Sequence, residues 1–432
     1  MAFLHSDSKE SIKSELSLFT LPTTQTAIEN SHWVQYKPIS SLSDQSPIEF
    51  TIPGNTEYID LAQTLLSVKV EIFKDTEDDG TLKETGPVNN FLHSLFNQVD
   101  VYFNQKPVSP PNNAYAYRSY IETLLNYGPA AKNSHLTSVL WFDDTPGKMD
   151  NVKGENEGFV KRQETMTDGK IDLIGHLHCD IFNQDRLLLG GVEVRLKLIR
   201  SRDTFCLMDP TGVFKVRIKE ATLFVRRLKI NPSIALAHEK MLTHTTAKYP
   251  LTRVEVKAIT LHSGIYGETL DNVILGQLPK RIIVGFVENS AYNGDKSLNP
   301  FDFKNLNINL LCLYVDGVQV PSKPLQPNFK TNMYVDAYHT LFSGTGINFL
   351  NMGNSISREA YANGFCLFAF DLTPDLSANQ DTHWNLIKNG SVRIDVRFDD
   401  ALKSTINCII YAEYDNVLEI DSSRQVFVDY SG

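Results

Sequence analysis

The sequence repeats four landmarks in the same order, and this internal repeat limits the folds that the chain can adopt. The matching segments are LLSVKVEI at 65–72 with PKRIIVGF at 279–286 (shift 214), VYFNQKPV at 101–108 with LYVDGVQV at 313–320 (shift 212), Thr123-Leu124-Leu125 with Thr340-Leu341-Phe342 (shift 217), and GVEVRLKL at 191–198 with SVRIDVRF at 391–398 (shift 200). Each match is weak alone, but four matches in one order indicate a duplicated unit of about 200 residues. The 432 residues therefore hold two similar units.

Both units consist of short apolar runs separated by turn residues. The candidate strands are Ile48–Ile52, Leu65–Phe73, Val99–Phe103, Ile171–Phe182, Val192–Ile199, Val213–Leu228, Val254–His262, Arg281–Val287, Ile308–Val315, Phe365–Leu372, Val392–Phe398 and Ile406–Tyr414. Runs such as VEVRLKLIR alternate apolar and polar residues, which is the period of a strand with one buried face. The pairs Asn104-Gln105 and Asp316-Gly317 are predicted hairpin turns. The pattern predicts an all-β protein with antiparallel sheets.

A short amphipathic helix is predicted after each hairpin. The segments are AYRSYIETLLNYG at 116–128 and MYVDAYHTLFSGTG at 333–346. In the first, Tyr117, Tyr120, Ile121 and Leu124 fall at i, i+3, i+4 and i+7, which gives one apolar helix face. Gly128 and Gly344 are placed to end the two helices. We expect each helix to lie at the same corner of its own sandwich.

The fold class that fits is two tandem eight-stranded antiparallel jelly rolls, a double jelly roll, each with a short inserted helix and long surface loops. Immunoglobulin-like sandwiches are the alternative, but they run to about 100 residues, half of the repeat. The expected organisation is an N-terminal arm at 1–46, a first jelly roll at 47–230, a linker at 231–252 with a short helix, a second jelly roll at 253–421 and a C-terminal tail at 422–432. The polar, glycine-rich stretch 143–170 is expected to be a long surface loop.

Charge and cysteine content exclude some classes of protein. The net charge of −10 argues against a general nucleic-acid binder. The five cysteines, Cys179, Cys206, Cys312, Cys366 and Cys408, form no CxxC pair and are expected to be buried free thiols, as in a reducing compartment. The first residues, MAFLHSDSKE, do not resemble a secretory signal, and no apolar run approaches the ~18 residues of a membrane span.

One stretch carries a local excess of positive charge. Its ten basic residues are Arg195, Lys197, Arg200, Arg202, Lys215, Arg217, Lys219, Arg226, Arg227 and Lys229, and its three acidic residues are Asp203, Asp209 and Glu220. One interpretation is an exposed sheet face paired with acids elsewhere in the fold. The other is a contact with an acidic neighbouring subunit or with packaged nucleic acid.

The only candidate metal pair is His176 and His178, in the strand-like GHLHCDIF. Strand alternation would place both imidazoles on one face, as in the jelly-roll cupin enzymes. A glutamate should follow within a few residues, but Cys179 to Asn183 contain none, so a structural pair is favoured. His238 and His244 are poorly spaced for a metal. We therefore assign no catalytic, cofactor-binding or metal-binding residues, and no cofactor.

Three long segments closely resemble one protein family. They are IPGNTEYIDLAQTLLSVKVEI at 52–72, GPVNNFLHSLFNQVDVYFNQKPVSPPNNAYAYRSYIETLLNYG at 86–128 and IDLIGHLHCDIFNQDRLLLGGVEVRLKLIRSRDTFCLM at 171–208. The chain resembles the double jelly-roll major capsid proteins of Polinton (Maverick) elements and adintoviruses. The match is good over about residues 50–210, with YRSYIETLLNYG as its most specific motif, and the second half agrees in layout.

The resemblance implies a structural protein and no enzyme. Family members are expected to form homotrimers whose six jelly rolls make a pseudo-hexagonal capsomer of an icosahedral shell. The partners would be neighbouring capsomers, penton and minor capsid proteins, and possibly packaged DNA through the basic stretch. The location would be the virion capsid, assembled inside the host cell. The loop at 143–170 would form an outward tower, and the N-terminal arm would face inward or reach a neighbour.

Two other functions stay open from the residues alone. The first is a metal-dependent, bicupin-like enzyme that uses His176 and His178. The second is a receptor- or glycan-binding β-sandwich protein with its site in the loop at 143–170.

Overall fold

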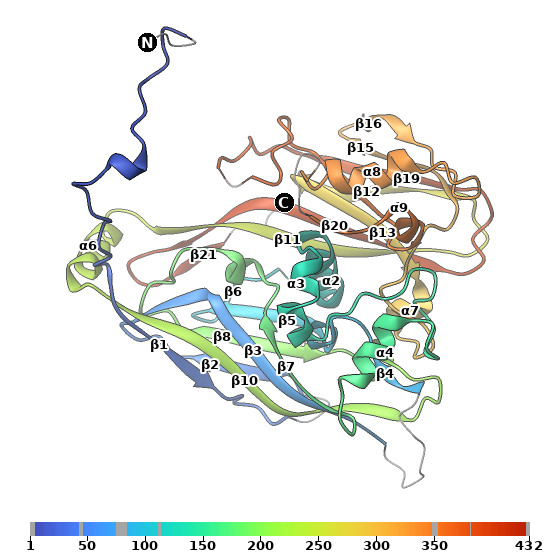
Figure 1. The fold of residues 1–432 in the computed structure, drawn as a ribbon, viewed down its shortest axis with the longest axis horizontal. Helices are drawn as coiled ribbons and strands as arrows, with labels where there is room; N and C mark the ends of the chain where they lie inside the picture. The colour runs from blue at the N-terminus through green and yellow to red at the C-terminus, as the bar shows by residue number, and fades with distance from the viewer. Residues whose placement is uncertain are drawn as a thin grey trace.

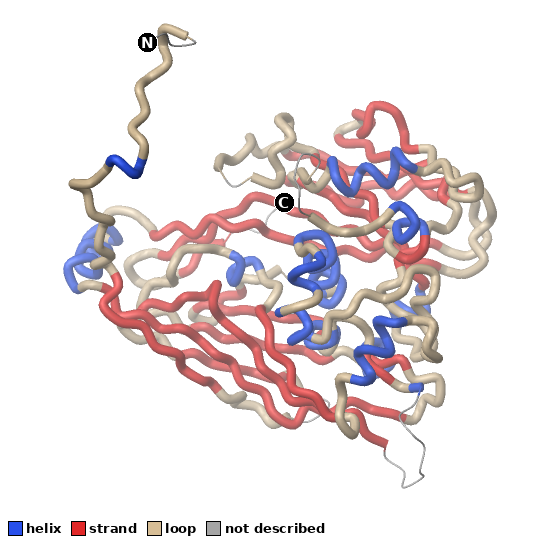
Figure 2. The backbone as a smooth tube through the Cα atoms, viewed as in Figure 1, coloured by secondary structure: helices blue, strands red, loops and turns tan. Residues whose placement is uncertain are grey.

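The computed structural model of the chain describes residues 5–42, 46–74, 84–110, 114–347, 353–380 and 382–428 (Figure 1). Two antiparallel β-sandwiches follow one another along the chain, and short helices lie between and around them (Figure 2). We call the strands and helices of residues 28–230 the first unit and those of residues 247–428 the second unit.

The first unit contains two four-stranded sheets. One has the order β1 (Ile28–Tyr36), β10 (Phe214–Ile230), β3 (Tyr58–Lys74), β7 (Lys170–His176), and the other has the order β2 (Ile48–Ile52), β8 (Val194–Arg200), β5 (Phe96–Phe103), β6 (Lys106–Pro107). In β3, Leu66, Val68, Val70 and Ile72 are buried and Lys69 is exposed. The alternation in the sequence is therefore the alternation between core and solvent.

The second unit repeats this topology. One sheet has the order β11 (Ala247–Leu261), β20 (Ile406–Ile420), β13 (Arg281–Glu288), β18 (Leu367–Asp371), with β21 (Val426–Val428) also paired to β20, and the other has the order β12 (Gly267–Gln277), β19 (Asn389–Phe398), β15 (Ile308–Val315), β16 (Val318–Leu325). The four landmarks of the repeat fall on corresponding elements in the two units. The predicted double jelly roll is confirmed.

Smaller elements complete the fold. The remaining strands are β4 (Gly86–Pro87) paired with β9 (Leu207–Met208), and β14 (Phe303–Lys304) paired with β17 (Asn363–Gly364). The helices are α1 (Phe91–Ser94), α2 (Tyr115–Asn126), α3 (Pro129–Lys132), α4 (Glu157–Glu164), α5 (Asp203–Cys206), α6 (Pro232–Leu242), α7 (Asn289–Asn293), α8 (Val335–Ser343) and α9 (Arg358–Ala362), with short 3-10 turns at Ser14–Leu16, His135–Val139 and Asp180–Asn183.

Both predicted hairpin turns are present. Asn104 and Gln105 have φ of 45° and 69°, and Asp316 and Gly317 have φ of 49° and 78°. Two consecutive positive φ angles are what a tight two-residue hairpin turn requires, and Asn, Asp and Gly adopt them most readily.

The two predicted helices follow these hairpins but have different surroundings. In α2 every residue from Tyr115 to Leu125 is buried, because the helix contacts α1 and β5 of its own unit and β11 of the second unit. In α8 only Ala337, Thr340 and Leu341 are buried, and the helix packs on β18 of its own unit. Gly344 ends α8, and a Cβ there would lie 2.3 Å from the backbone oxygen of Ala369. That superposed units overlay the two helices stays a prediction.

The structure corrects two expectations about loops. Residues 28–36, placed in the N-terminal arm, form β1 on the edge of the first sheet. This strand has no buried residue, so its sequence lacks the alternation that marks a strand. The segment 143–170, expected to be a surface loop, contains α4 and the fully buried Phe159 and Arg162. The polar composition of the segment does not indicate this burial. The buried polar side chains Arg162 and Asn156 both bond to Asp144 within the segment.

The linker and the tail also hold regular structure. The stretch 231–252 contains the expected helix, α6, and then the start of β11. In the tail, 422–432, β21 pairs with β20, and residues 429–432 lie outside the described residues, as do 1–4 and 43–45 of the arm. The exact domain boundaries stay predictions. All five cysteines are buried and free, as expected.

Candidate functional site at the contact between the two units

Helix α2 of the first unit lies against the second unit (Figure 1). Two of its tyrosines make this contact. Tyr117 stacks against Tyr292 with ring centroids 5.5 Å apart, and its hydroxyl donates to the backbone oxygen of Pro300 at 3.0 Å. Tyr120 stacks on Phe301 with centroids 4.2 Å apart and planes 2° apart. The sequence predicted that these tyrosines form an apolar face. It gave no sign of their partners, which are about 180 residues away in the sequence.

The polar side of α2 joins a buried charge network. Arg118 Nε donates to Glu122 Oε1 at 2.9 Å, and Arg118 Nη1 lies 2.7 Å from Asp180 Oδ1. His178 Nδ1 lies 2.6 Å from Glu122 Oε2. The hydroxyl of Tyr411, on β20 of the second unit, donates to Glu122 Oε1 at 3.2 Å. One carboxylate therefore links both units.

Burial and neighbouring charges set the pKa values in this network. Burial alone would raise the pKa of Glu122, but Arg118 and the hydrogen bond with His178 lower it to about 2. Burial would lower the pKa of Arg118, but Glu122 and Asp180 raise it well above its ordinary value. Burial raises the pKa of Asp180 in spite of Arg118. The Arg118–Glu122 pair is consequently ionised at neutral pH.

The network continues toward α8. The Tyr411 hydroxyl also lies 3.1 Å from Glu413 Oε1, and Arg281 Nη1 donates to Glu413 at 3.1 Å. Arg281 Nε donates to the backbone oxygen of Gly344 at 2.9 Å, at the end of α8. A chain of polar contacts thus runs from the helix of one unit to the helix of the other.

A second polar contact between the units involves the segment 143–170. Arg162 Nη2 lies 2.6 Å from Asp144 Oδ1, and both side chains are fully buried. From the second unit, Asn299 Nδ2 donates to Asp144 Oδ2 at 3.0 Å, and the Asn299 backbone N–H donates to Asp150 at 2.6 Å. This segment serves as part of the contact between the units.

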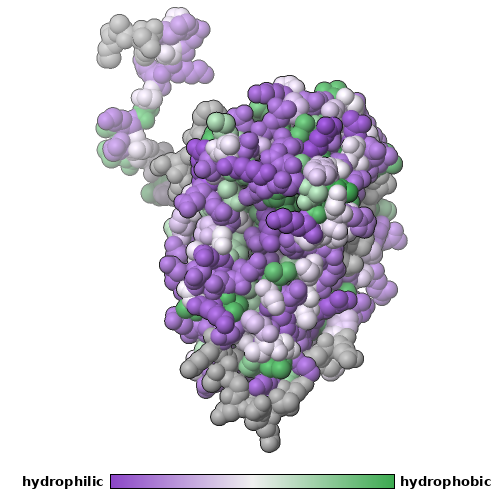
Figure 3. Space-filling view, turned by 90° about the vertical axis from the view of Figure 1, so that its right-hand side faces the viewer, coloured by the Kyte–Doolittle hydropathy of each residue, from purple (hydrophilic) through white to green (hydrophobic). Residues whose placement is uncertain are grey.

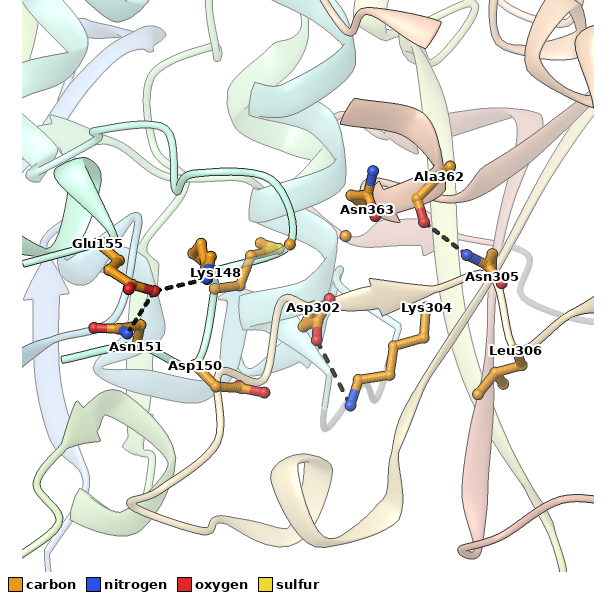
Figure 4. Close-up of a pocket in the computed structure, with 13 residues that line it drawn as sticks. Lys148, Asp150, Asn151, Glu155, Asp302, Lys304, Asn305, Leu306, Ala362 and Asn363 are labelled. Carbon is orange, nitrogen blue, oxygen red and sulfur yellow. Dashed lines mark hydrogen bonds and ion pairs between the residues drawn. The ribbon is translucent and has the colours of Figure 1, made fainter. Parts of the chain in front are cut away.

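A cleft of about 640 Å³ opens beside this contact, between the segment 147–155 and the β14 and β17 strands (Figure 4). Its walls carry the ion pairs Lys148–Glu155, at 2.7 Å, and Lys304–Asp302, at 3.7 Å. Burial raises the pKa of Asp302 to about 6, and Lys304 opposes this shift. A carboxyl group with a raised pKa therefore lies where the two units meet.

The two histidines that the sequence offers as a metal pair lie on different local structures, and His178 has a carboxylate partner. Strand β7 ends at His176, so strand alternation does not continue to His178. His178 binds Glu122, and its ring lies edge-on to His93, with centroids 4.7 Å apart. Among the residues that the structure describes, no group of three or more His, Cys, Asp or Glu side chains is arranged to hold a metal ion.

Carboxylates on neighbouring strands offset much of the basic stretch. The ion pairs are Arg195–Glu49 at 2.6 Å, Lys219–Glu71 at 2.6 Å, Arg226–Asp60 at 3.0 Å, Lys229–Glu29 at 3.2 Å, Arg200–Asp203 at 3.5 Å and Arg227–Glu57 at 4.0 Å. Most of these acids lie in the arm, β2 and β3, outside the stretch. The arrangement favours the interpretation as a paired sheet face.

Large apolar side chains are exposed on several elements of the second unit. Those at the start of α8, directly before it, or in the loop before β19 are Met333 (71%), Val335 (46%), Leu376 (68%), Trp384 (51%), Leu386 (90%) and Ile387 (70%). The face seen in Figure 3 is, by contrast, mostly hydrophilic with small scattered apolar groups. In the described part of the chain, no helix has the length and hydrophobicity needed to cross a bilayer.

Known proteins resemble this chain over nearly its whole length. No family model matches the sequence. An uncharacterized protein of Caenorhabditis elegans, F54H12.2, is 26% identical over 429 residues, covering 95% of this chain and 99% of that protein.

Solved structures of low sequence identity share the fold over nearly all of the chain. A chain of the Sputnik virophage has a TM-score of 0.61 at 13% identity, covering 100% of this chain and 95% of its own. PBCV-1 VP54 has a TM-score of 0.62 at 10% identity, covering 96% and 100%. The mavirus major capsid protein has a TM-score of 0.57 at 12% identity, covering 99% and 97%. The chain therefore has the double jelly-roll fold found in viral major capsid proteins.

Proposed function

We propose that this chain is a major capsid protein, a structural subunit without catalytic activity. The observation that carries the proposal is the pair of sandwiches with one strand order, joined in a single chain whose whole length matches viral capsid proteins in fold. The motif YRSYIETLLNYG supports placement with the capsid proteins of Polinton (Maverick) elements and adintoviruses. The location would be the capsid of the virion, assembled inside the host cell.

The assembly that we propose is a homotrimer with six jelly rolls in a pseudo-hexagonal ring. Within one chain, the second unit covers α2 of the first. If each second unit meets the first unit of the next chain in a similar way, three chains close a ring through heterologous contacts. The open side of α8 and the exposed apolar residues near it support this arrangement, because a soluble monomer gains nothing from exposing them. Such capsomers would tile an icosahedral shell, with penton and minor capsid proteins as further partners.

Contact of the basic stretch with packaged DNA stays a prediction. The ion pairs on neighbouring strands leave a smaller net positive charge than the sequence suggested. Non-specific DNA binding would therefore be weak at physiological salt.

The test is the mass and shape of the purified full-length chain. Multi-angle light scattering should give three times the chain mass over a tenfold range of concentration. Negative-stain microscopy should show particles with a hexagonal outline or closed shells. A monomer at the highest concentration, without shells under crowding or high salt, would overturn the proposal.

A further inference from the structure

The N-terminal segment contains an exposed apolar run. Every residue from 5 to 27 is exposed, and the segment leads away from the two sandwiches (Figure 1). Leu16, Leu18, Phe19 and Leu21 are exposed by 69%, 76%, 97% and 91%. The stretch 16–21, LSLFTL, contains no charged residue. Large apolar side chains clustered in this way usually mark a contact with another surface.

The root of this segment is fixed. Gln25 and Ile28 are joined by two hydrogen bonds, at 2.8 and 3.1 Å. The backbone N–H of Asn231 donates to the backbone oxygen of Ala27 at 2.8 Å, and the Asn231 side chain caps α6. The segment therefore leaves the body at a defined point beside α6, and the apolar run is carried outward.

An apolar groove of about 520 Å³ lies at this same point. It is formed by α6, the first residues of β1 and β11, and the loop 186–189, and its apolar lining includes Ile28, Leu187, Ile230, Ile234, Met241 and Leu242. The volume is within the ~300–1,000 Å³ of pockets that bury most of a bound group. Met241 is 57% exposed, so the groove is open to solvent. Arg186 and Lys248 line it as well, and Lys248 Nζ lies 3.6 Å from a carboxylate oxygen of Glu419, so the positive charge of this lining is carried mainly by Arg186.

We propose that Leu16–Leu21 of one copy occupies this groove on a neighbouring copy of the chain. The apolar run matches the apolar lining, and Glu15, directly before it, is opposite in charge to Arg186 in the lining. A second copy is the occupant because the segment of the same chain continues away from its own groove (Figure 1). The inference rests on the proposed function in that it requires self-association.

A cross-linking experiment with two singly substituted full-length chains tests this. One chain carries Phe19→Cys, and the other carries Met241→Cys and a tag that changes its size. The five native cysteines are buried, so a short bis-maleimide reacts first at the introduced thiols. The two chains are co-assembled, treated and separated on a denaturing gel. The matched control replaces Met241→Cys by Leu275→Cys, on the 70% exposed Leu275 of β12, outside the groove.

We expect at least tenfold more cross-linked heterodimer with Met241→Cys than with Leu275→Cys. A chain that carries both substitutions and cross-links only within itself would overturn the proposal, because the segment would then fold back on its own groove. A sample that light scattering shows to be oligomeric, but that gives no heterodimer above the control, would overturn this inference alone. A monomeric sample would overturn both this inference and the proposed function.

Discussion

The ring of Tyr120 stacks on the ring of Phe301, with centroids 4.2 Å apart, and the two residues belong to different units. Both side chains have no exposed surface. Tyr120 projects from the helix that marks the first unit, whereas Phe301 precedes β14 in the second. The core of the first unit is thus completed by the second, and we expect the chain to unfold as one cooperative body.

Phe301→Ala should lower the free energy of unfolding by about 3–5 kcal/mol, because a fully buried aromatic ring leaves a cavity between the units. Urea unfolding followed by tryptophan fluorescence measures the loss. The matched control is Phe427→Ala, on the 48% exposed Phe427 of β21, which should change the free energy by less than about 1 kcal/mol. A loss below 1 kcal/mol at Phe301 would show that the two units are stable without this contact.

Glu122→Gln should lower the free energy of unfolding by about 3–5 kcal/mol at pH 7, because it removes one of the two carboxylates that pair with the buried Arg118. The fold lowers the pKa of Glu122 from 4.5 to about 2, so its charge stabilises the folded state fully above pH 4.5. That stabilisation is lost as the pH falls from 4.5 toward 2. Unfolding at pH 7 and pH 3 should show a smaller difference between wild type and variant at pH 3. Glu268→Gln, at an exposed position of β12, is the control. A pH-independent difference would contradict the assignment.

Asp302→Asn should stabilise the protein at pH 7.5 more than at pH 5. Burial raises the pKa of Asp302 from 3.8 to about 6, so the folded state binds its proton more tightly than the unfolded state. The contribution of Asp302 to stability is therefore largest below pH 3.8 and falls as the pH rises to 6, by about 3 kcal/mol at 1.36 kcal/mol per pKa unit. The amide removes this penalty, less any loss of the Lys304 ion pair. Melting temperatures at the two pH values decide the outcome, with the exposed Asp271→Asn as control. Equal shifts at both pH values would show that Asp302 is ionised throughout.

Local patterns in the sequence predicted the sheets well. Strand alternation in β3 and the turn pair Asp316-Gly317 depend only on neighbouring residues, so they can be read from short windows. The duplication extended this to topology, because two copies with matching landmarks must share one strand order. The sequence did not predict strand β1, because none of its residues is buried and it therefore has no apolar face. Main-chain hydrogen bonds pair it with β10.

The contacts between the units could not be predicted in the same way. The spacing of His178 from His176 makes it a candidate metal ligand, whereas its partner in the fold, Glu122, lies 56 residues earlier in the sequence. The composition around Arg162 predicts a polar loop, but its side chain is fully buried and paired with Asp144. A charged residue gives the same local signal whether its partner is water or a distant side chain, so only the assembled fold distinguishes the two cases.

Val335→Glu should abolish the trimer and leave the fold of the monomer intact. The residues of α2 are buried and in contact with the second unit, but Val335 at the start of α8 and Met333 before it are exposed. In the proposed ring, the next chain covers these residues, and a glutamate there would bury an unpaired carboxylate. We expect association at least 100-fold weaker, a change of about 3 kcal/mol. Light scattering measures the mass, and circular dichroism confirms an unchanged melt. The control is Val213→Glu, on the 42% exposed Val213 before β10, which should remain trimeric. If Val335→Glu also remains trimeric, another surface closes the ring, and the loop with Trp384 becomes the next to test.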